Sequence, residues 1–84
     1  MKDYTVYILR STITDRFYIG QTQDLADRLR RHQLGYVRST KGRGPWELFW
    51  SYRVATRSEA MEMEGDLKRL KSRTGLLRYL EDLE

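Results

Sequence analysis

Glu64 carries a charge at a position where helical spacing predicts burial. With residues placed at about 100° each along a helix, Glu64 falls inside the arc that holds Ala60 and Leu67. An unpaired charge on an apolar face is costly, so this carboxylate needs a cation, hydrogen bonds or a metal. An i, i+4 ion pair with Lys68 is one explanation, with Lys71 as a second nearby cation, and spacing alone slightly favours it over a metal site.

Arg28 and His32 have the types and spacing needed to bind one anion. They lie four residues apart, on the same side of a predicted helix as Leu25 and Leu29, at the edge of its buried face. Arginine offers a planar fork of donors to a phosphate, and histidine can donate or shuttle a proton near neutral pH. For a lone histidine, however, an imidazole at the edge of the core, bonded to backbone, is the commoner situation.

Tyr7 and Tyr18 occupy the first two predicted strands. In an antiparallel hairpin of suitable register, both hydroxyls would emerge on one face. Tyrosines in strands usually serve packing. A tyrosine can also act as a general base, but its ordinary pKa of about 10 means that a metal or an arginine must first stabilise the phenolate.

A basic segment lies in the middle of the chain, which has a formal net charge of +4. Between residues 28 and 43 there is no acidic residue, and this stretch predicts a surface that faces an anion. The alternative is a solvated helix face followed by a mobile loop. The segment contains six cations: Arg28, Arg30, Arg31, Arg38, Lys41 and Arg43.

The elements that must position these groups begin with two strands. Residues 4–9 and 17–20 alternate bulky and β-branched side chains around a turn-like run, which predicts a hairpin. Thr22 or Asp24 can cap the helix that follows, and Gly35 is a plausible end for it. Residues 36–45 are rich in glycine and basic residues, so we expect a loop there.

The second half of the chain predicts one strand and two helices. Apolar residues occupy every second position from 46 to 54, the pattern of a half-buried strand. Thr56 and Glu59 form a capping box before a helix that starts near Arg57. After Gly75, leucines at helical spacing predict a short C-terminal helix that packs onto the sheet. The predicted order is β-β-α-β-α-α.

Composition narrows the class of protein. The 84 residues suffice for one domain spanning 1–84, and 39% of them are hydrophobic, enough for a small core. The absence of cysteine excludes disulfides, thiolate zinc sites and cysteine catalysis. No apolar signal core or membrane-length apolar stretch occurs, so we expect a cytoplasmic protein without membrane contacts.

Five motifs in order resemble the GIY-YIG nuclease domain over nearly the whole chain. The resemblance is closest to the small stand-alone bacterial members, and the chain is similar to the N-terminal catalytic domain of the excision-repair nuclease UvrC. Thr5 and Val6 replace the Gly and Ile of the family name, Gln33 stands where an Asn is frequent, and Gly65 has no explanation from sequence. The motifs are Val6-Tyr7-Ile8, Phe17-Tyr18-Ile19-Gly20, Arg28-Leu29 with His32, Gly42 to Leu48, and Glu64 before Leu67-Lys68.

The resemblance implies a fold and a set of roles. The expected class is α/β, of the α+β kind, with a small, mostly antiparallel sheet of about three strands flanked by helices. Glu64 would bind a single Mg²⁺ or Mn²⁺, Tyr7 would deprotonate the attacking water and Arg28 would hold the scissile phosphate, while Tyr18 and His32 would assist. The expected nucleic-acid contacts are Arg28, Arg31, Arg38, Lys41, Arg43 and Lys68.

The leading functional prediction is a metal-dependent endonuclease that hydrolyses DNA phosphodiesters, in repair or recombination, with DNA preferred over RNA. The alternative is a nucleic-acid-binding module that keeps the fold but cuts poorly alone. A third reading, a protein adaptor that uses the Trp46 to Trp50 face, is disfavoured because those tryptophans alternate as core residues do.

Overall fold

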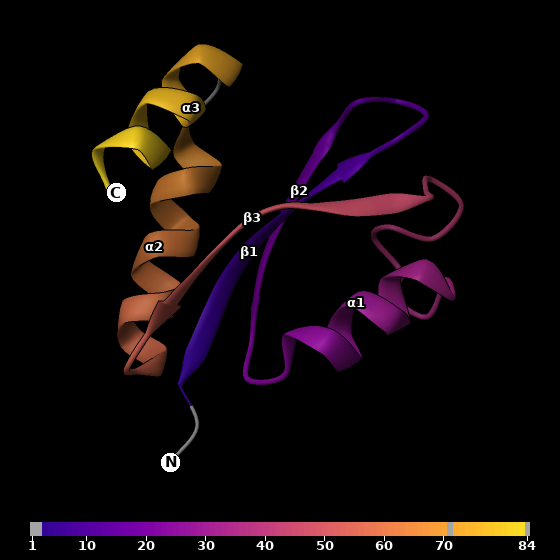
Figure 1. Ribbon diagram of the computed structural model, residues 1–84, viewed down its shortest axis with the longest axis horizontal. Coiled ribbons are helices and arrows are strands. Elements are labelled where there is room, and N and C mark those ends of the chain that lie inside the picture. Colours follow the sequence, from indigo (N-terminus) through magenta and orange to yellow (C-terminus); the bar gives the residue numbers. More distant parts are fainter. Residues whose placement is uncertain (1–2, 71, 84) are drawn as a thin grey trace.

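The computed structural model describes residues 3–70 and 72–83 and shows a three-stranded antiparallel sheet of order β2-β1-β3. The strands are β1 (Tyr4–Ser11), β2 (Phe17–Thr22) and β3 (Trp46–Val54). Helix α1 (Leu25–Gln33) lies on one side of the sheet, with α2 (Arg57–Arg69) and α3 (Arg73–Asp82) on the other (Figure 1). The predicted fold class and element order are confirmed. Within the described residues, no helix is long and apolar enough to cross a bilayer.

Side-chain caps set where each helix begins. The side chain of Asp24, rather than that of Thr22, accepts from the backbone N–H of Asp27 at the start of α1. Thr56 caps α2 as the capping box predicts. Ser72 caps α3 by accepting from the N–H of Gly75, so this glycine lies in the first turn of α3 and does not precede the helix.

The central strand β1 separates two apolar clusters. Val6 and Ile8 point to the side of α2 and α3, where they pack with Ala60, Leu67, Leu76 and Leu80. Tyr7 and Leu9 point to the side of α1, where they pack with Trp46 and with Tyr18, Leu25 and Leu29. Because side chains alternate along a strand, β1 fills both clusters from one short segment.

A bulge in β3 corrects the expectation that its alternating apolar residues share one face. Ile8 pairs with Trp50 and Leu9 with Leu48, so Phe49 is an extra residue in β3. Trp46 therefore joins the α1 side, whereas Trp50 packs on the α2 side. Trp46 is only 5% exposed, which leaves it unable to serve as an adaptor surface.

Candidate active site

The hydroxyl of Tyr7 lies over Gly20 on the neighbouring edge strand. The two residues are paired across β1 and β2. A Cβ atom at Gly20 would lie 2.6 Å from the Tyr7 hydroxyl oxygen and 2.8 Å from its ring carbon Cζ, so close that the Tyr7 ring would have to shift. Gly20 is therefore the residue that allows the Tyr7 ring to reach across β2.

His32 meets this hydroxyl from α1. The Tyr7 hydroxyl oxygen lies 2.9 Å from His32 Nε2, and His32 Nδ1 lies 2.8 Å from Thr40 Oγ1. The imidazole is buried, with 2% of the residue exposed. Both ring nitrogens thus bond to side chains, so the structure does not show the backbone-bonded imidazole of the alternative interpretation.

Tyr18 completes an aromatic cluster around the imidazole. Its ring centroid lies 5.0 Å from that of His32 and 6.4 Å from that of Tyr7. Tyr7 and Tyr18 both face α1, so the two tyrosines lie on the same face of the sheet, as the predicted hairpin register requires. The structure therefore brings Tyr7, Tyr18 and His32 together, from two strands and one helix.

Burial sets the protonation of this cluster. It raises the pKa of the Tyr7 phenol above its ordinary value, and Tyr18 and Glu64 raise the pKa further, while Arg28 lowers it. Burial, followed by the charge of Arg28, lowers the pKa of His32. Near neutral pH the Tyr7 phenol is consequently protonated and the His32 imidazole is neutral. The charges of Arg28 and Glu64 act on the Tyr7 phenol through space. In the described residues neither side chain forms a hydrogen bond or ion pair with Tyr7, Tyr18 or His32.

Glu64 lies on α2 against the outer strand. Its Oε1 accepts from Gln21 Nε2 at 3.2 Å, and its Oε2 lies 2.8 Å from Lys68 Nζ. The ion pair expected from the spacing is therefore present, and Gln21 adds a second partner. Lys71, the other candidate cation, lies outside the described residues.

Glu64 offers a divalent cation a small set of protein ligands. Among the described residues, no group of three or more His, Cys, Asp or Glu side chains could hold a metal. Mg²⁺ is commonly bound through one or two carboxylates, several waters and substrate phosphates. Lys68 is 57% exposed on a flexible side chain, so it can leave the carboxylate. A single half-buried carboxylate at Glu64 fits this mode of binding.

The six predicted nucleic-acid contacts fall into two groups. Arg31 pairs with Asp27 and Lys68 with Glu64, so these two cations already have acidic partners. Arg28 is half-buried and lines a hollow at the end of β2 that also contains Arg57. The remaining three are exposed on the loop between α1 and β3, and in the described part of the chain no ion pair involves them: Arg38, Lys41 and Arg43.

The loop between α1 and β3, residues 34–45, is anchored to the sheet. Ser11 donates from Oγ to the carbonyl of Arg43 at 2.7 Å. Next to the loop, the Gln33 side chain both donates to the Trp46 carbonyl and accepts from the Trp46 N–H. The amide of Gln33 thereby ties the end of α1 to the start of β3. The loop holds its basic side chains outward on a fixed support.

Thr40 and Gln21 were not expected at the site. Each is a single polar residue in a polar stretch, and no spacing distinguishes it from a surface side chain. Thr40 is nevertheless only 1% exposed, because it faces His32. Contacts of this kind depend on how a loop folds back, which residue periodicity does not report.

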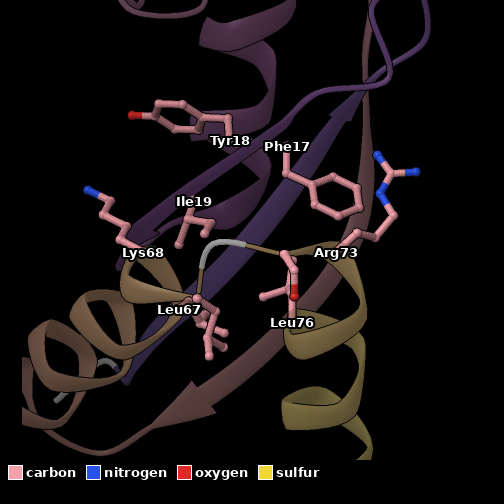
Figure 2. Close-up of a pocket in the computed structure, with 9 residues that line it drawn as sticks. Phe17, Tyr18, Ile19, Leu67, Lys68, Arg73 and Leu76 are labelled. Carbon is pink, nitrogen blue, oxygen red and sulfur yellow. The ribbon is translucent and has the colours of Figure 1, made fainter.

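A groove of about 400 Å³ runs beside β2, between that strand and the turn from α2 to α3. Figure 2 shows Tyr18 and Lys68 on one side of it and Phe17 and Arg73 on the other, with Leu67 and Leu76 between them. Lys68 belongs both to the groove and to the ion pair with Glu64. Tyr18 and Lys68 are thus the two residues that the groove shares with the aromatic cluster and with the ion pair of Glu64.

Gly65 follows Glu64 inside α2 without a steric need for glycine. A Cβ at this position would meet only Arg69 Nη1, at 3.7 Å, an ordinary contact. We expect Gly65→Ala to stabilise the fold by about 0.5–1 kcal/mol, because alanine is the better helix former. The melting temperature should rise by roughly 2–8 °C in a thermal unfolding experiment. A lower melting temperature would show that Gly65 meets a constraint other than these contacts.

Relatives of known sequence match most of this chain. It is 37% identical over 70 residues to the UPF0213 protein OB0043 of Oceanobacillus iheyensis, covering 82% of this chain and 80% of that one. It is 36% identical over 74 residues to a UPF0213 protein of Citrobacter koseri, covering 87% and 73% respectively. These names state no activity.

A solved structure and a family model agree with the fold described above. The solution NMR structure of the UPF0213 protein BH0048 from Bacillus halodurans matches with a TM-score of 0.58 and 31% identity, over 98% of this chain and 85% of that one. The model of the GIY-YIG catalytic domain matches residues 3–76, a span that includes Tyr7, Tyr18, Arg28, His32 and Glu64. The chain therefore belongs to the GIY-YIG family of nuclease domains.

Proposed function

We propose that this protein is a metal-dependent endonuclease that hydrolyses phosphodiester bonds, with DNA as the substrate in preference to RNA, in repair or recombination. The observation that supports this most is the Tyr7 hydroxyl, held over Gly20 and bonded to a neutral His32. The charge of Arg28 on α1 lowers the pKa of this hydroxyl, and the charge of Glu64 on α2 raises it. A base, a cation and a carboxylate form a minimal set of groups for phosphodiester hydrolysis.

In the proposed mechanism, Tyr7 takes the proton of the attacking water. Arg28 holds the scissile phosphate and stabilises the charge that develops on its oxygens. Tyr18 packs beside the imidazole and helps to orient it. Glu64 would hold Mg²⁺ or Mn²⁺, which supplies Lewis-acid stabilisation of the phosphate and lowers the pKa of a water.

The raised pKa of Tyr7 limits how this step can proceed. A phenolate formed before the reaction would be a rare species near neutral pH, because burial opposes the charge more than Arg28 favours it. Tyr7 therefore accepts a proton as it gives up its own, which requires an acceptor next to its hydroxyl. His32 Nε2, at 2.9 Å, occupies that position.

A cleavage assay with branched, nicked and single-stranded DNA and with RNA tests the proposal. We expect cutting in the presence of Mn²⁺ or Mg²⁺ and none in a chelator. The alternative, a binding module with little activity alone, is favoured by one feature, the Lys68–Glu64 ion pair that occupies the carboxylate. Tight binding without cleavage under every metal condition would select that alternative.

The three exposed cations of the 34–45 loop are proposed to supply most of the phosphate affinity. Replacing Arg38, Lys41 and Arg43 together with Ala should weaken binding and reduce the slope of log affinity against log salt by roughly 2–3 units, because each neutralised phosphate releases counterions. Titration of a labelled oligonucleotide at several salt concentrations measures this slope.

A charge-matched control separates this loop from general electrostatics. Arg16 in the loop between β1 and β2, Arg53 on β3 and Arg78 on α3 are also exposed cations. Their triple Ala variant loses the same net charge and should keep most of the salt slope. Equal slopes for the two triple variants would contradict the assignment of the loop.

A further inference from the structure

Thr40 ends a chain of hydrogen bonds that starts at the Tyr7 hydroxyl. Tyr7 bonds to His32 Nε2, His32 Nδ1 bonds to Thr40 Oγ1, and the Thr40 hydroxyl donates to the Val37 carbonyl at 3.3 Å. All three side chains are at most 2% exposed. Trp46 Nε1 donates to the Thr40 carbonyl at 3.2 Å, which holds this residue against the core.

The number of hydrogens on each group determines which atom donates in each of these hydrogen bonds. The one hydroxyl hydrogen of Thr40 has two neighbours, the Val37 carbonyl at 3.3 Å and His32 Nδ1 at 2.8 Å. A carbonyl can only accept, so both contacts are hydrogen bonds only when the Thr40 hydrogen goes to Val37. Thr40 Oγ1 then accepts from Nδ1–H of His32, and the bare Nε2 accepts from the Tyr7 hydroxyl. In the reverse direction the phenol hydrogen would have no acceptor in the described part of the chain, since its one bond there is to Nε2.

We propose that Thr40 is a positioning residue, which holds His32 in the Nδ1–H tautomer so that Nε2 receives the Tyr7 proton during hydrolysis. This inference rests on the proposed function and deepens it. In the sequence Thr40 stands in the basic loop among nucleic-acid-binding candidates, yet its side chain points inward to the imidazole. The proposed phosphate contacts and the residue that positions the proton acceptor would thus share one short segment.

The proton balance of the step is complete with groups of this site. As the water oxygen bonds to phosphorus, its proton moves to the Tyr7 oxygen and the Tyr7 proton moves to His32 Nε2. The bond from phosphorus to the leaving oxygen breaks, and that oxygen takes a proton from solvent. The imidazolium, with Nδ1–H still bonded to Thr40, returns its extra proton to solvent and restores the starting state.

The tautomer can be measured directly, because His32 is the single histidine of the chain. Long-range ¹H–¹⁵N correlation spectra of the ¹⁵N-labelled protein distinguish a protonated ring nitrogen from a bare one. We expect a protonated Nδ1 and a bare Nε2 in the wild-type protein and in Thr40→Ser. Thr40→Val keeps the shape but removes the acceptor, so its spectrum should shift toward the Nε2–H tautomer.

Cleavage rates test the consequence for the reaction. Thr40→Val should cleave roughly 10- to 100-fold more slowly, the range typical of residues that orient a working histidine, and Thr40→Ser should restore most of the rate. Melting temperatures identify any variant that has lost its fold. A wild-type spectrum with Nε2–H would overturn the inference, as would a folded Val variant with the wild-type rate. If the wild-type protein cleaves nothing, the proposed function fails, while the spectra still decide the direction of the hydrogen bonds.

Discussion

Tyr7→Phe should lower the rate of cleavage by roughly 10²- to 10⁴-fold, the contribution typical of a general base. The substitution removes one oxygen and leaves the ring in the cluster with Leu9 and Trp46. Binding should be nearly unchanged, because no proposed phosphate contact is lost. Single-turnover cleavage with excess protein measures the rate, and anisotropy of a labelled oligonucleotide measures the affinity.

The same hydroxyl can be displaced without being removed. In Gly20→Ala the new Cβ would meet the Tyr7 hydroxyl oxygen at 2.6 Å, so the ring must shift and its 2.9 Å contact with His32 Nε2 is disturbed. A comparable loss of cleavage is expected, and Gly65→Ala serves as the control for adding a methyl group elsewhere. A Tyr7→Phe variant that cuts at nearly the wild-type rate over a range of pH would assign the role to His32 or to hydroxide.

Most of the fold could be predicted because its elements follow simple periodicities. The capping box at Thr56, the apolar alternation from 46 to 54 and the leucine spacing near the C-terminus each depend on neighbours in sequence. The bulge at Phe49 could not be predicted in this way. The alternation of apolar residues is the same in the sequence whether or not a bulge moves part of the strand to the other face of the sheet. Ser72 caps the start of α3, whereas the sequence pattern predicted that this helix starts after Gly75.

The candidate site could be predicted in part for the same reason. Arg28 and His32 are four residues apart on one helix, so local geometry predicts that they lie on the same side of α1. The meeting of His32 with Tyr7 spans 25 residues, and that of Gln21 with Glu64 spans 43, so each depends on how α1 or α2 packs on the sheet. Residue types indicated the chemistry, but only packing determines which atoms bond.

Glu64→Gln should abolish detectable cleavage while changing the stability of the metal-free protein little. The carboxamide keeps the shape and can still bond to Gln21, but it loses the charge that a hard divalent cation needs. Losing the ion pair should change the free energy of unfolding only slightly, because Lys68 is 57% exposed and such i, i+4 pairs contribute about 0.3–0.5 kcal/mol. The structure thus makes stability alone a weak discriminator between a metal site and an ion pair.

Metal-dependent melting discriminates between the two roles. A cation that binds the native wild-type protein at ten times its Kd adds about 1.4 kcal/mol of stability, a rise of roughly 6–11 °C for a domain of this size. Glu64→Gln should show no such rise in Mg²⁺ or Mn²⁺. Glu62→Gln, an exposed carboxylate on the same helix, should retain both the rise and the cleavage.

The purely structural role of Glu64 makes the opposite prediction. If its function is to pair with Lys68, Glu64→Gln and Lys68→Met should each lower the melting temperature slightly, with equal effects in metal and in chelator. The folded Gln variant would then still cut. Because Lys68 competes with a cation for the same carboxylate, Lys68→Met should instead strengthen metal binding if Glu64 is the ligand. A Gln variant that is destabilised but still active would exclude Glu64 as the metal ligand.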